Sequence, residues 1–202
     1  MFFFGEVEIM SDYETISNKL KEMLELKKNP VAVRLYEYLG DVDENLEKFE
    51  GEERHCGMLK EVAVNKRSFY ATENEYSCPN GSAALGLTDG DLKNVPKVDG
   101  IIEAVAYAPL EKATFKPDVI VLYVNPVQMM KIAQKLRRNA GKRTVGDFSG
   151  VQSLCADVVS KPYLTNESNM SVGCGGSRGF KNIDPDELVV GLTLSDAESI
   201  VN

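Results

Sequence analysis

The sequence contains no tryptophan, one histidine and four cysteines among its 202 residues. Because His55 is the single histidine, the chain cannot form a metal site with several histidine ligands. Disulfide staples are not needed either, since a chain of this length that is 43% hydrophobic buries about 70% of its unfolded surface in one core. A metal site with several histidines is therefore excluded, and a fold stapled by disulfides is not expected. The four cysteines remain as candidates for a functional site.

Long apolar runs are also lacking. No run approaches the roughly 20 residues that a bilayer crossing requires, and the apolar residues 2–4 have neither the basic flank nor the cleavage site of a signal peptide. We therefore expect a cytoplasmic protein without a membrane partner.

Basic residues are outnumbered, and the formal net charge of −8 opposes nonspecific binding to nucleic acid, which depends on clustered lysine and arginine. The densest basic segment, residues 131–143, contains no aromatic side chains. It is interpreted as the solvated end of a helix, so nucleic acid is not an expected partner.

The hydrophobic pattern predicts an α/β fold, with α+β as the alternative, in a single compact domain whose mixed sheet is flanked by helices. We assign this domain to residues 11–202 and treat residues 1–10 as an N-terminal extension. Expected helices cover residues 11–28, 53–65, 82–87, 126–139, 151–160 and 195–201, and expected strands cover residues 30–36, 69–72, 101–108, 119–124, 170–172 and 188–194.

The four cysteines are Cys56, Cys78, Cys155 and Cys174, and their spacing forms no Cys-x-x-Cys motif. Cys78 precedes a helix start, and Cys174 opens a glycine-rich turn, so backbone amides can converge on both sulfurs. Cys56 and Cys155 lie in expected helices among apolar neighbours, where a buried inert thiol is the alternative to a ligand. If all four converge, they suit a [4Fe–4S] cluster or zinc, and the alternative is no metal at all.

Two further residues have polar chemistry near these cysteines. His55 lies on a charged helix face, where it is interpreted as solvated, with ligation or acid/base chemistry as the alternative. Arg178 follows the glycine-rich turn and is expected to clamp an anionic substrate or to balance the charge of a cluster. The segment 173–179 matches neither a dinucleotide fingerprint nor a P-loop, so nucleotide binding has little support.

Several segments together resemble domain-of-unknown-function family 169, the uncharacterised ArCR proteins of archaea and anaerobic bacteria. The resemblance runs from about Ser11 to the C-terminus, and the segments that carry it are residues 30–33, 78–87, 117–126, 148–150, 155–157, 162–165, 171–178 and 186–191. It implies that cysteines recur at the four positions found here. It also implies a second cysteine, in many members, where this chain has Ser177, so a dithiol redox role is not expected.

The leading hypothesis is an iron–sulfur protein that binds one [4Fe–4S] cluster through the four cysteines, with the 173–179 turn as a lid. It would act in electron transfer, or in cluster or sulfur delivery to a partner in an anaerobic enzyme system. One alternative is an enzyme or binding module for a small anionic ligand, with structural or nucleophilic cysteines. Another is a zinc-stapled accessory subunit. The sequence leaves enzymatic activity and oligomeric state open.

Overall fold

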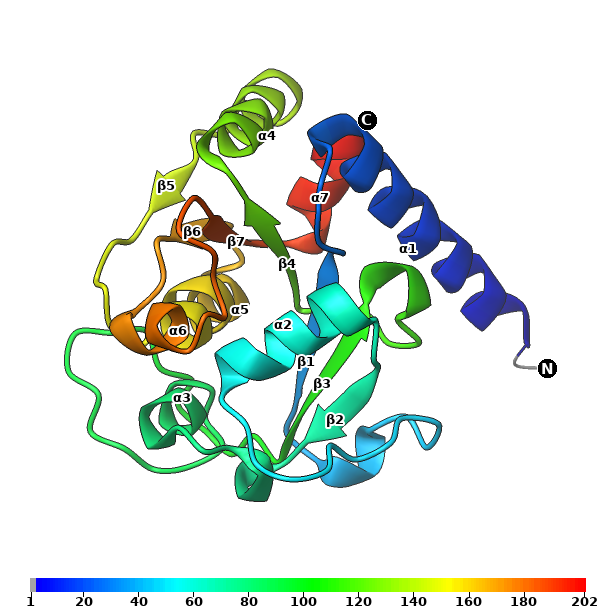
Figure 1. The fold of residues 1–202 in the computed structure, drawn as a ribbon. Coiled ribbons are helices and arrows are strands. Elements are labelled where there is room, and N and C mark those ends of the chain that lie inside the picture. Colours follow the sequence, from blue (N-terminus) through cyan, green and yellow to red (C-terminus); the bar gives the residue numbers. More distant parts are fainter. Residues whose placement is uncertain (1–2) are drawn as a thin grey trace.

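A mixed sheet of seven strands runs through the described chain (Figure 1). The computed structural model describes the backbone of residues 3–202 and the side chains of residues 12–202. Strand order is β2-β3-β1-β4-β7-β6-β5, and neighbours are antiparallel except β5 and β6, which are parallel. The strands are β1 (Val31–Tyr36), β2 (Phe69–Ala71), β3 (Ala104–Pro109), β4 (Val119–Val124), β5 (Val145–Gly146), β6 (Asn169–Ser171) and β7 (Leu188–Leu192).

Helices cover both faces of the sheet, which gives three layers and confirms the predicted α/β class (Figure 1). One face is covered by α1 (Phe3–Leu24), α4 (Pro126–Asn139) and α7 (Leu194–Val201). The other face is covered by α2 (His55–Asn65), α3 (Pro79–Ala84) and a π-helix, η4 (Ser153–Ser160), which continues into α5 (Lys161–Thr165). The remaining helical elements are short. They are α6 (Gly175–Gly179) and the 3-10 turns Leu39–Asp41, Glu73–Glu75 and Leu110–Lys112.

The central strand β4 explains why two helical layers form. All six of its residues are buried, and their side chains alternate between the faces. Val119, Val121 and Tyr123 join the core beneath α2 and η4, whereas Ile120, Leu122 and Val124 join the core beneath α1 and α4. A strand whose side chains are apolar on both faces of the sheet must be shielded from water on both faces, and the two helical layers do this.

The structure corrects three details of the predicted elements. The first helix begins at Phe3, eight residues before the expected start at Ser11. The expected helix over residues 151–160 is a π-helix that begins at Ser153, after Gln152 in the left-handed region with φ 44°. The predicted glycine-rich turn contains the short helix α6, with Cys174 as its N-cap. In addition, no helix of the described residues is long and apolar enough to span a membrane.

Gly191 of β7 allows η4 to lie directly on the sheet. A Cβ atom at this position would stand 1.9 Å from the carbonyl oxygen of Val158 in η4. Only glycine permits so close an approach between strand and helix backbones. Because η4 contains Cys155, this contact also sets the position of one cysteine.

Candidate functional site

All four cysteines line one cavity of about 410 Å³ in the layer formed by α2, α3, η4 and α6. Cys56 is the second residue of α2, Cys78 precedes α3, Cys155 lies in η4 and Cys174 precedes α6. The four thiols are free; Cys56 and Cys155 are buried, and the other two are partly exposed. The structure thus brings together the four residues that the sequence analysis singled out.

Gly81, in the first turn of α3, forms part of the cavity wall between two of the sulfurs. A Cβ atom placed on Gly81 would lie 3.5 Å from Sγ of Cys78 and 3.9 Å from Sγ of Cys155. The two sulfurs are therefore separated by no more than the sum of these distances. The missing side chain leaves open space beside both sulfurs.

Cys174 is surrounded by hydrogen-bond donors. The backbone N–H of Ser177 donates to its sulfur over 3.3 Å, and the Ser177 hydroxyl accepts from the Cys174 N–H. Burial raises the pKa of Cys174, but hydrogen bonds from Ser177 and from the backbones of Ser153 and Gly176 outweigh this effect and leave the pKa below its usual value. The N-terminus of the π-helix and the start of α6 together favour a thiolate here.

Cys56 and Cys155 are in the opposite electrostatic situation. Burial raises the pKa of both thiols, and the nearby Cys78 and Cys174 raise it further. The amide of Asn182 donates to Sγ of Cys56 over 3.2 Å and partly offsets the burial. Both residues are thus neutral thiols until a positive charge enters the cavity.

Comparison with known proteins places the chain in a family over nearly its whole length. The family model for domain-of-unknown-function family 169, described as uncharacterised ArCR, matches residues 19–98 and 91–202. The chain belongs to this family. It is also 33% identical to an uncharacterized protein of Methanocaldococcus jannaschii over 210 aligned positions, which cover 92% of this chain and 90% of that protein. No solved structure matches the chain significantly.

In this family 169 chain, Arg178 is not part of the cavity wall. Its guanidinium donates to the backbone carbonyls of Val172, Asp184, Pro185 and Glu187. These bonds tie α6 to the loop before β7 and use the donors that an anion would need. The structure therefore gives Arg178 a part in holding the loop and does not bear out the expected anion clamp.

His55 corrects the expectation of a solvated side chain, because it is only 2% exposed and lines the cavity. Its Nδ1 lies 2.7 Å from the hydroxyl of Tyr107, which in turn hydrogen-bonds to the hydroxyl of Tyr76. Burial lowers the pKa of His55 to about 3, against a smaller opposite effect of the Leu154 backbone, so the ring is neutral near pH 7. The other nitrogen, Nε2, is buried without a hydrogen bond of normal geometry to any described residue.

The described side chains form no ready-made site for a single metal ion. Within residues 12–202, no three histidine, cysteine, aspartate or glutamate side chains are close enough to hold a single metal ion. Tetrahedral zinc with bonds near 2.3 Å needs its sulfurs about 3.8 Å apart. The thiols as described do not form such a tetrahedral set.

Several polar residues of the site were missed from the sequence. Arg54, Asn80 and Gln152 line the cavity, and each lies within three residues of a cysteine, which is the signal that could have identified them. Asn182 and Tyr107 had no such signal, since tertiary contacts bring them to Cys56 and His55.

Proposed function

We propose that this family 169 protein binds one [4Fe–4S] cluster through Cys56, Cys78, Cys155 and Cys174. The observation that carries the proposal is that thiols from four separate segments line a single cavity. A domain of this size has a radius of gyration of about 17 Å. Four buried cysteines without a shared role would therefore lie scattered through it and would not gather at one cavity. When bound, such a cluster supplies one-electron transfer.

The residues around the cavity fit a cluster. Amide hydrogen bonds to sulfur, as at Cys174, stabilise thiolate ligands and tune a cluster. Gly81 and Gly176 leave room beside the sulfurs, because a Cβ atom on either would lie within 4 Å of one of them. A cubane holds its thiolates about 6 Å apart, wider than zinc does, so a cluster needs less close convergence of the four thiols than the zinc alternative.

The role that we propose is electron transfer, or the delivery of a cluster or sulfur to a protein partner in an anaerobic enzyme system. Cys78 and Cys174, the two partly exposed thiols, lie on the approach from solvent. A partner that docks there would come near the cluster without unfolding the layer of α2 and η4.

Metal and sulfide analysis tests the proposal. Protein purified without oxygen should contain about four irons and four sulfides per chain and should absorb broadly near 400 nm. Stoichiometric zinc without sulfide would contradict it. A colourless, folded protein with four reactive thiols and no metal would also contradict it.

Gly81→Ala provides a sharper test of the space between two thiols. Alanine favours a helix more than glycine does, and the added Cβ would make only ordinary contacts with protein atoms, so the fold should be retained. The methyl group would occupy the space between Cys78 and Cys155, and we expect the iron content to fall by at least half. Circular dichroism and iron analysis measure the two effects.

The matched control is Gly179→Ala in α6, where a Cβ atom would have no neighbour within 4 Å. Its iron content should equal that of the unmodified protein. Full iron content in Gly81→Ala would show that no cluster occupies the space between these two sulfurs.

A further inference from the structure

The cysteine cavity is larger than a cluster. Its volume is about 410 Å³, within the range of roughly 300–1,000 Å³ found for pockets that hold whole organic ligands. A cubane is a body of only eight atoms with bonds of about 2.3 Å. Part of the cavity therefore stays open to a second, smaller ligand.

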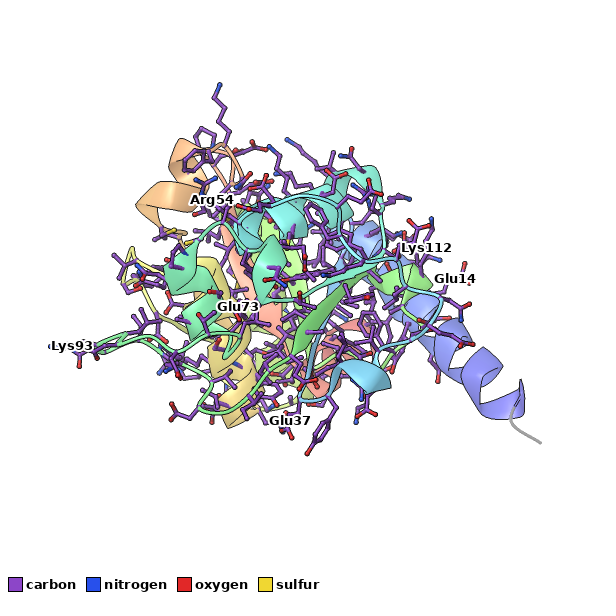
Figure 2. All side chains as sticks on the ribbon, turned by 90° about the horizontal axis from the view of Figure 1, so that it is seen from below. Glu14, Glu37, Arg54, Glu73, Lys93 and Lys112 are labelled. Carbon is purple, nitrogen blue, oxygen red and sulfur yellow. The ribbon has the colours of Figure 1, made fainter. Side chains whose placement is uncertain are left out.

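Arg54 is the charged residue in the cavity wall. Its guanidinium stacks on the ring of Phe180, with 3.5 Å between the guanidinium carbon and the ring centroid, and Figure 2 shows it beside the ribbon of α6. Its ion pair with Glu53, at 3.9 Å, is long, and within residues 12–202 the guanidinium makes no hydrogen bond. The contact with the ring holds the guanidinium at this place and leaves its N–H groups available for an oxyanion.

Neutral hydrogen-bonding groups complete this part of the wall. Asn80 and Gln152 line the same cavity as Arg54, and neither side chain hydrogen-bonds to another described residue. Gln152 has the left-handed φ of 44°, a conformation that costs free energy and is concentrated at functional sites. Nε2 of His55, also in the wall, is buried and makes no hydrogen bond of normal geometry to a described residue.

We infer that the cavity binds a small oxyanion, a molecule bearing a carboxylate or phosphate group, between the Arg54 guanidinium and the amides of Asn80 and Gln152. This inference rests on the proposed function for the identity of the neighbouring group, but its contacts are independent of iron. Arg54 thus takes the anion-binding role that was expected of Arg178. The bound oxyanion would lie beside the cysteines, in the position of a substrate or a co-ligand.

Line broadening in NMR spectra tests the site with two simple probes, inorganic phosphate observed through ³¹P and ¹³C-labelled acetate. Each probe is titrated at constant ionic strength into the full chain purified without oxygen, and the iron content of the same samples is measured separately. We expect saturable broadening for at least one probe, and the stronger of the two identifies the group that the site prefers.

Arg54→Gln should weaken the binding of that probe at least tenfold, and Asn80→Ala should weaken it several-fold. Arg67→Gln is the matched control, because Arg67 also stacks on aromatic rings, those of Phe49 and Phe69, but lies outside the cavity wall; its binding should be unchanged. Absence of saturable binding by both probes would overturn the inference, as would equal binding in Arg54→Gln and Arg67→Gln. A protein that binds the probe but contains no iron would refute the proposed cluster alone.

Discussion

Cys78→Ser and Cys174→Ser proteins, purified without oxygen, should each lose most of their iron and sulfide. Serine offers a harder oxygen ligand that is protonated at neutral pH, so it replaces a thiolate poorly on iron. Both residues precede short helices whose backbone begins at the cavity, and no other described thiol could take over their positions. Iron and sulfide analysis, together with absorption near 400 nm, measures the loss.

The same series separates the two kinds of cysteine. Cys56 is held by Asn182 and has its pKa raised by burial, so Cys56→Ser shows whether this thiol is a ligand or part of the core. A full cluster in Cys56→Ser alone would mean that one iron is open to substrate, which favours chemistry over electron transfer. An unchanged spectrum in all four single variants would end the shared-site hypothesis.

Gly191→Ala should lower the free energy of unfolding by about 1–3 kcal/mol, the usual range for overpacking of a filled interior. The new Cβ would stand 1.9 Å from the Val158 carbonyl oxygen and 3.1 Å from Cγ1 of Val119. Neither side can yield easily, because β7 pairs with β4 and β6 while η4 packs on the sheet. Denaturant unfolding of the metal-free chain measures the effect.

Gly40→Ala is the control for this variant, since a Cβ atom at Gly40 would have no neighbour within 4 Å. Its unfolding midpoint should be close to that of the unmodified chain. Iron content should also fall in Gly191→Ala, because displacement of η4 moves Cys155. If Gly191→Ala and Gly40→Ala unfold at the same denaturant concentration, the close contact between β7 and η4 does not contribute to the stability of the fold.

The hydrophobic pattern predicted the bounds of an element correctly where the local sequence signals all agreed. The strand over residues 119–124 is a run of apolar and β-branched residues with turn signals beside it, and it forms β4 with the same bounds. The helix over residues 126–139 combines proline at its first turn with an amphipathic face, and its bounds also agree. Local chemistry was sufficient in both cases.

The π-helix could not be predicted in this way. Residues 151–160 have helical spacing, but the distinction between an α-helix and a π-helix depends on a change in hydrogen-bond register that no residue type specifies. Here the register is associated with the left-handed Gln152 before the helix and with the close contact between Val158 and Gly191. The position of Cys155 in the cavity follows from that geometry.

The amino-acid pattern was enough to predict a layered α/β fold, because apolar runs, proline and glycine influence the backbone over only a few residues. It also predicted that Cys78 stands beside a helix start, whereas the short helix after Cys174 was not predicted. Tertiary structure alone decided that Cys56, Cys78, Cys155 and Cys174 face one cavity, that His55 is buried against Tyr107, and that Arg54 lines the cavity while Arg178 holds a loop. These outcomes depend on contacts between residues as far apart as Cys56 and Asn182, and the pattern within any one segment contains no information about which distant segment will pack against it.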